Sequence, residues 1–219
     1  MEKKKSTSVI KRLPRYYRYL TELEKNGIDR ISSKELSEKM NVTASQIRQD
    51  LNCFGGFGQQ GYGYNVKNLY TEIAGILGLD SSYKAILVGA GNMGQAVAQN
   101  TNFEKRGFSL IGIFDIDPEK IGKEIAGITI SDYKNIKEFV EENQPIMAII
   151  STPRTTVNTV VSELTECGIK AFLNFSYAEI NPADGVVVEN IHLSDSLMRL
   201  CYKISARDNK NTQNEDCYL

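Results

Sequence analysis

The stretch VGAGNMG places three glycines, Gly89, Gly91 and Gly94, directly after an apolar run at 86–88. The spacing G-x-G-x-x-G between a strand and a helix is typical of a dinucleotide site. The first glycine permits a tight turn, the second lets the backbone approach a pyrophosphate, and the third allows close helix–strand packing. Free N–H groups at the helix N-terminus then face the phosphates. The predicted cofactor contacts are Gly89, Ala90, Gly91, Asn92, Met93, Gly94 and, as argued next, Asp115.

Asp115 ends the apolar run SLIGIFD and lies 21 residues after Gly94. A carboxylate there accepts hydrogen bonds from the adenosine ribose hydroxyls and repels a 2′-phosphate, and no Arg follows at 116–118 to offset that repulsion. The pattern therefore favours NAD, as NADH and NAD+, over NADP. Two alternatives stay open, namely a Gly-rich turn without a cofactor, and coenzyme A or another adenosine ligand.

A catalytic set is missing beside this site. A dehydrogenase needs a general acid or base near the hydride, and His192 is the only histidine of the chain. It falls at the start of the last predicted helix, away from the ligand edge of the sheet. Tyr133 and Lys137 do not serve either, because their helix is predicted to be exposed. We expect no enzyme and no catalytic residue, and four scattered cysteines with one histidine predict no metal site.

The second half of the chain alternates strands and helices, which predicts a Rossmann-like, doubly wound parallel sheet. The expected strands are 84–88, 109–115, 146–151, 170–175 and 185–189. The expected helices lie near 92–101, 134–143 and 154–167.

The first half predicts a winged helix-turn-helix. After a helix over 9–26, Ser32 with Glu35 and Thr43 with Gln46 mark the starts of two short helices, at 33–40 and 44–54. A Gly-rich aromatic hairpin with its tip at Gln59 and Gln60 would form the wing, and a helix over 66–77 follows.

A helical wheel of 44–54 places Ile47, Leu51 and Phe54 toward the core, with Asp50 to the side. Ser45, Arg48, Gln49 and Asn52 share the opposite face. Arg reads guanine and Gln or Asn reads adenine in a major groove, so this face predicts DNA recognition, with an ordinary solvated face as the alternative.

The charged residues are also distributed unevenly between the two halves of the chain. Residues 1–84 hold 14 Lys and Arg against 9 Asp and Glu, whereas residues 85–219 hold 12 against 18. A basic half fits a polyanion partner, although a solvated charged end is the alternative. The predicted contacts to double-stranded DNA are Arg12, Arg15, Ser45, Gln46, Arg48, Gln49, Asn52, Gln59 and Gln60.

We expect four regions: a DNA-binding domain at 1–80, a cofactor domain at 81–190, a last helix at 191–206 and a polar, disordered tail at 207–219. The helix carries an apolar stripe, Leu193, Leu197, Leu200 and Ile204, which needs a partner. No apolar stretch reaches the ~20 residues of a membrane span, and no signal peptide is recognisable, so we expect a cytoplasmic protein with no membrane contact.

Several stretches together resemble the redox-sensing transcriptional repressors called Rex, over about residues 8–206. They are RISSKELSEKMNVTASQIRQDLNCFGGFG, GYGYNV, ILGLD, VGAGNMG, FDIDPEKIG, GIKAFLNF and VVVENIHL. The resemblance implies a winged helix, a Rossmann domain, and a homodimer whose last helix swaps onto the partner. It also implies a repressor that binds palindromic operators with NAD+ and leaves them with NADH.

This sequence departs from the family pattern at several positions. Gln49 and the tip Gln59–Gln60 replace residues that are usually basic. Of the family's Arg, Tyr and Asp that exchange partners in the switch, Arg18 remains, whereas Asn100 and His192 replace the other two. We therefore expect a weakened response to NADH. The alternatives are a Rex-like regulator that holds a dinucleotide without a redox response and, from another class, an NAD-dependent oxidoreductase with an accessory N-terminal domain.

Overall fold

The computed structural model describes residues 7–55, 58–59, 62–100, 103, 106–181 and 184–215. Gln60 lies outside these residues, as do the side chains of Gln59 and Asn100. The chain forms two compact units, Met1–Ser81 and Ser82–Leu219, each of which is taken by itself below.

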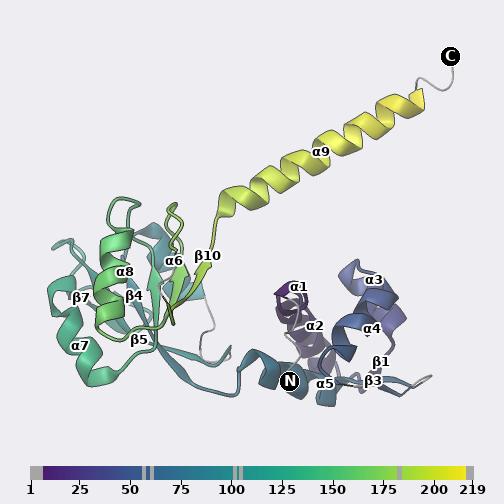
Figure 1. Cartoon of the computed structure of the whole chain (residues 1–219), viewed down its shortest axis with the longest axis horizontal. Helices are drawn as coiled ribbons and strands as arrows, with labels where there is room; N and C mark the ends of the chain where they lie inside the picture. The colour runs from purple at the N-terminus through teal and green to yellow at the C-terminus, as the bar shows by residue number, and fades with distance from the viewer. Residues whose placement is uncertain are drawn as a thin grey trace. The chain divides into compact units, whose positions relative to one another are not determined.

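The first unit is a helical domain with a small antiparallel sheet (Figure 1). The helices of its described part are α1 (Thr7–Ile10), α2 (Leu13–Lys25), α3 (Ser33–Met40), α4 (Ala44–Asn52) and α5 (Val66–Leu77). The strands run in the order β1 (Arg30–Ile31), β3 (Gly63–Asn65) and β2 (Gly58–Gln59). This arrangement of two short helices followed by a hairpin confirms the winged helix-turn-helix.

The single helix expected over 9–26 is two helices, with a turn at Lys11 and Arg12. Pro14 is in the first turn of α2, where its missing N–H does no harm. A continuous helix would set the Pro14 ring against the carbonyl of Ile10, so the helix breaks before it. The starts of α3 and α4 are as predicted, because Ser32 and Thr43 accept hydrogen bonds from the backbone N–H of Glu35 and Gln46.

The second unit contains a seven-stranded sheet in the order β10-β9-β8-β4-β5-β7-β6. All neighbouring strands are parallel except β6 and β7, which form an antiparallel edge pair. The strands are β4 (Tyr83–Val88), β5 (Phe108–Asp115), β6 (Glu124–Ile125), β7 (Ile128–Asp132), β8 (Met147–Ile150), β9 (Ala171–Asn174) and β10 (Val187–Asn190). The order reverses between β4 and β8, which creates the crevice where such sheets bind ligands.

Helices cover both faces of this sheet (Figure 1). Alternate residues of β4 point to opposite sides, so Leu87 packs in the cluster that includes Ala98 of α6 (Asn92–Asn100). Ile86 and Val88 pack in the other cluster, with α7 (Ile136–Asn143) and α8 (Val157–Glu166). A short 3₁₀ helix, η2 (Tyr133–Asn135), precedes α7.

The last helix, α9 (Leu193–Glu215), is longer than the expected 193–206. Much of the tail that we expected to be disordered is therefore helical, and the segment 207–215 has no Gly or Pro that would end a helix. Its apolar stripe is exposed over about half or more of each side chain, at Leu193, Leu197, Leu200 and Ile204. No described helix is long and apolar enough to cross a membrane.

Candidate functional site

The three glycines after β4 differ in how far the surrounding structure requires a glycine. Gly89 has a φ of +98°, and a Cβ there would lie 2.7 Å from the carbonyl oxygen of Ser151. A Cβ on Gly94 would lie 2.0 Å from the carbonyl oxygen of Gly89. At Gly91 φ is not positive and an added Cβ meets nothing within 4 Å, so the protein itself does not require glycine there. The open space beside Gly91 fits the close approach of a ligand phosphate.

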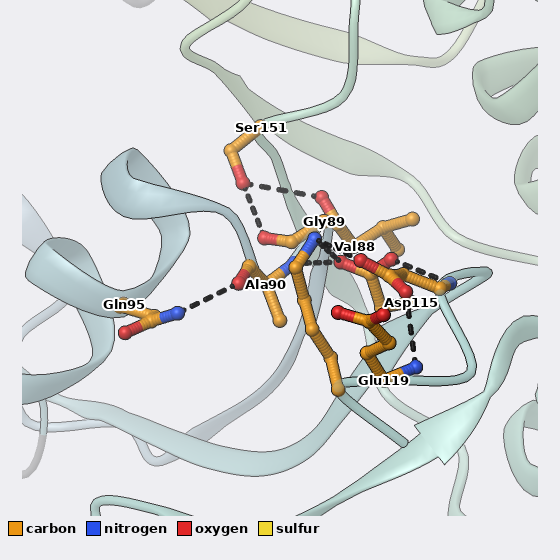
Figure 2. A network of polar contacts seen from close by, with 9 residues as sticks. Val88, Gly89, Ala90, Gln95, Asp115, Glu119 and Ser151 are labelled. Carbon is orange, nitrogen blue, oxygen red and sulfur yellow. Dashed lines mark hydrogen bonds and ion pairs between the residues drawn. The ribbon is translucent and has the colours of Figure 1, made fainter.

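Asp115 ties the end of β5 to the glycine turn (Figure 2). Its Oδ2 accepts a hydrogen bond from the N–H of Ala90 at 2.6 Å, and its Oδ1 accepts one from the N–H of Asp117 at 2.9 Å. The hydroxyl of Ser151, at the end of β8, donates to the carbonyl oxygen of Gly89 at 2.6 Å. Asp115 thus shapes the turn in addition to facing the cavity, a role that the sequence did not indicate.

Lys120 is a cation of the site that the sequence did not indicate, because it lies beyond 116–118, where a cation beside Asp115 would be expected. Its Nζ lies 3.4 Å from Oδ2 of Asp115 and 3.2 Å from Oδ2 of Asp117. Burial lowers the pKa of Lys120, but the contacts with Asp117 and Asp115 outweigh this and raise it above its ordinary value. Two carboxylates face one ammonium, so the group keeps a net negative charge.

A cavity of about 810 Å³ opens at the carboxyl ends of β4, β5 and β8. Its volume lies within the ordinary range for small-molecule sites. Gly91 and Asp115 line it, together with Thr152 after β8 and Phe175 after β9. The buried Oγ1 of Thr152 has no hydrogen-bond partner within the described part of the chain. Such an orphan polar atom suits a ligand that supplies the missing partner, so these residues fit a dinucleotide.

Sequence reasoning missed Ser151, Thr152 and the segment 175–177 as cavity residues. Their signal was present, because each directly follows a strand of the parallel sheet at its carboxyl end. His192, by contrast, is half-buried just before α9 and does not line the cavity.

In the first unit, α4 presents the predicted polar face. Ser45, Arg48, Gln49 and Asn52 are exposed, whereas Ile47 and Leu51 are fully buried. The Nη1 of Arg48 donates to the hydroxyl of Ser33 at 3.0 Å, in an exposed hydrogen bond between α4 and α3.

Asp50 does not point sideways as expected; it is 1% exposed and accepts four hydrogen bonds. Arg12 donates from Nε at 2.6 Å and from Nη2 at 2.7 Å. The Tyr16 hydroxyl donates at 2.9 Å and the Gln46 amide at 2.8 Å. Burial raises the pKa of Asp50, but these hydrogen bonds from Arg12, Gln46 and Tyr16 outweigh burial and hold it below its usual value.

This network engages the side chains of Arg12 and Gln46 with Asp50, although Arg12 keeps 30% of its side chain exposed. The assignment of both residues as DNA contacts stays a prediction. The other predicted residues are less constrained. Arg15 is half-buried and Arg18 is exposed on α2, and the backbone of Gln59 lies in β2. No group of three or more His, Cys, Asp or Glu that could hold a metal occurs among the described residues.

Two family models match the chain. A model described as "Putative DNA-binding protein N-terminus" matches residues 5–52, and one described as "CoA binding domain" matches residues 80–178. The redox-sensing transcriptional repressor Rex of Clostridium perfringens strain SM101 is 55% identical, and the alignment covers 96% of this chain and all of that protein. Rex of Thermoanaerobacter pseudethanolicus is 52% identical, over 94% of this chain and 92% of the relative.

Two solved structures of RSP are similar to this chain over nearly its whole length. The crystal structure of RSP with β-NAD+ and operator DNA has a TM-score of 0.86 and 50% identity, and covers 95% of this chain and 96% of that one. The structure of RSP with β-NADH has the same TM-score and 47% identity, with 94% and 97% coverage.

Proposed function

The chain belongs to the Rex family of redox-sensing transcriptional repressors, and from this premise we propose that it binds operator DNA through α4 and NAD(H) in the cavity beside Gly91. The observation that supports the cofactor most directly is Gly91 itself. Neither its backbone nor a neighbour calls for glycine, whereas a bound pyrophosphate would.

The exposed face of α4 supports the DNA contacts. Ser45, Arg48, Gln49 and Asn52 carry donors and acceptors for base edges, and we propose these four together with Arg15. Arg12 and Gln46 anchor α4 through Asp50, and their direct contact with DNA stays a prediction from the sequence. The wing tip at Gln59 and Gln60 stays a proposal from the sequence.

We propose that the cofactor is a signal and not a substrate. The only histidine lies outside the cavity lining, and the relatives are repressors and not enzymes. Gly89, Ala90, Gly91, Asn92, Met93 and Gly94 would surround the phosphates, with Asp115 on the adenosine ribose. The oxidation state of the bound NAD(H) is then the signal that the protein reads. We propose that the repressor acts as a homodimer that is held together by α9.

NADH can release DNA only by binding the DNA-free protein more tightly than the DNA-bound protein, and by linkage DNA must weaken NADH binding by the same factor. With Arg18 kept but Asn100 and His192 in place of the family's Tyr and Asp, we expect a release that is weaker than is typical. A regulator with no redox response is the second candidate.

The test is a titration of operator DNA, selected from a random-sequence library, followed by fluorescence anisotropy with NADH and NAD+ in parallel. We expect NADH to lower DNA affinity more than NAD+ does. Arg48→Ala should cost about 1–3 kcal/mol of DNA binding, while Lys25→Ala, exposed at the far end of α2, should leave binding unchanged. Equal effects of the two dinucleotides would favour the second candidate.

A further inference from the structure

The cavity continues along one face of α8, beyond the residues assigned to the phosphates and ribose. Residues of this face follow one another at helical spacing, and they are Thr156, Thr159, Val160 and Glu163. Tyr133, the first residue after β7, lines the same cavity. The glycine turn and Asp115 leave these side chains of the cavity without an assigned function.

Tyr133 and Glu163 form a pair on this wall. The Tyr133 hydroxyl donates to Oε2 of Glu163 at 2.7 Å. Burial raises the pKa of Tyr133, and the hydrogen bond to Glu163 raises it further, so the hydroxyl stays a donor. Within the described residues, Oε1 of Glu163 accepts no hydrogen bond and Glu163 forms no ion pair. One carboxylate oxygen is therefore fixed, and the other is an acceptor without a partner on the wall of the cavity.

The ligand chemistry that suits this acceptor follows from its place. In a sheet of this kind the adenosine ribose lies at the acidic end of the second strand, which is Asp115 on β5. The base is attached to that ribose, and the wall with Tyr133 and Glu163 belongs to the same cavity. Adenine carries an amino group at position 6, which donates hydrogen bonds, whereas a carboxylate only accepts them.

We propose that Glu163, held in place by Tyr133, accepts a hydrogen bond from the 6-amino group of adenine and thereby selects adenine dinucleotides. The proposal rests on the proposed function, since it assumes that the cavity holds a dinucleotide. Hypoxanthine has a 6-oxo group in place of the amine, so two acceptors would face each other. Tyr133 keeps the carboxylate from moving to the neighbouring N1–H that hypoxanthine offers.

The probe is reduced nicotinamide hypoxanthine dinucleotide, compared with NADH by calorimetry on the full chain. The two differ only at the base, so their ratio of dissociation constants reports base recognition alone. We expect the hypoxanthine compound to bind about tenfold more weakly or worse, the cost of losing a hydrogen bond to a charged group. The conservative variant Glu163→Gln, whose amide donates as well as accepts, should bring the ratio close to one.

Two further variants separate recognition from general damage. Tyr133→Phe leaves the carboxylate but frees it, and should reduce the ratio part of the way. Glu166→Gln removes the same charge from the same helix at an exposed position outside the cavity lining, and should keep the wild-type ratio.

The outcomes are distinguishable. If the wild type binds neither compound, the proposed cofactor function fails and this inference fails with it. If it binds both equally, the cofactor assignment stands and the role of Glu163 is wrong. If Glu163→Gln leaves the ratio of the two dissociation constants unchanged, the role of Glu163 is also wrong. The comparison of the two compounds on the wild type does not depend on the folding of any variant.

Discussion

At the scale of single residues, Asp115 combines two tasks in one carboxylate. Oδ2 accepts hydrogen bonds from the N–H of Ala90 and from Lys120, whereas Oδ1 accepts one from the N–H of Asp117 and has a second lone pair for a ligand hydroxyl. The backbone contacts fix the carboxylate before the ligand arrives, so no side-chain freedom has to be lost on binding. Lys120 stands beside it as the counter-charge.

We predict opposite effects on cofactor choice for the two members of this pair. Asp115→Asn removes the charge that would repel a 2′-phosphate and breaks one backbone contact, so NADH affinity should fall about tenfold or more while the preference over NADPH narrows. Lys120→Met removes the nearby cation, so the preference for NADH should widen. Calorimetry measures the dissociation constants of NADH and NADPH for the wild type and both variants. If the wild type binds NADPH as tightly as NADH, the role assigned to Asp115 is wrong.

At the scale of elements, α4 is held to the start of α2 by an ion pair whose carboxylate is buried and whose guanidinium is partly exposed. Helical spacing correctly predicted that Ile47 and Leu51 face the core and that Arg48 and Asn52 face outward. It could not predict the environment of Asp50, because its partner Arg12 is 38 residues away in the sequence. A position at the edge of a helical wheel becomes buried or exposed according to which other element packs there.

The sheet, too, could be predicted from the sequence only in part. Strands with long apolar runs, such as β4 and β5, were predicted within one or two residues. The expected strands missed β6 and β7, where the run ITISD is half polar because β7 lies next to the edge of the parallel sheet. The glycine turn and Asp115 could be predicted because their chemistry is local, whereas Lys120 and the Tyr133–Glu163 pair depend on how separate elements meet.

We predict that the ion pair of Asp50 makes the first unit sensitive to acid. Because the folded protein holds the pKa of Asp50 below the usual 3.8, the unfolded chain binds a proton more readily. This part of the stability is complete above the unfolded pKa and is lost as the pH falls through the lower, folded value. Urea unfolding at a series of pH values measures it.

Matched variants isolate the contribution of the pair. Asp50→Asn should abolish that part of the acid dependence, and Arg12→Met, which leaves the carboxylate buried without its cation, should cost about 3 kcal/mol at neutral pH. Arg12→Met should also weaken operator binding, because α4 loses its anchor. Acid unfolding that is identical in the wild type and Asp50→Asn would show that the network contributes nothing measurable.

At the scale of the whole molecule, the described units divide the work between DNA and cofactor, and α9 is left over. Its stripe of Leu193, Leu197, Leu200 and Ile204 exposes more than half of each side chain. Burying such a side chain fully stabilises by about 1.5–3 kcal/mol, so four of them in a row favour a partner surface. Continuity with β10 places the start of α9 beside the cavity, where Leu193 contributes to the lining.

We therefore predict a homodimer that depends on α9. Deleting residues 193–219 should give monomers in sedimentation equilibrium and much weaker binding to a palindromic operator, because a dimer engages both half-sites at once and a monomer only one. Deleting only 208–219 keeps the whole stripe and should preserve both the dimer and the DNA affinity. The two deletions thus separate the apolar stripe from the polar end of the helix, and an intact dimer after the longer deletion would rule out α9 as the principal interface.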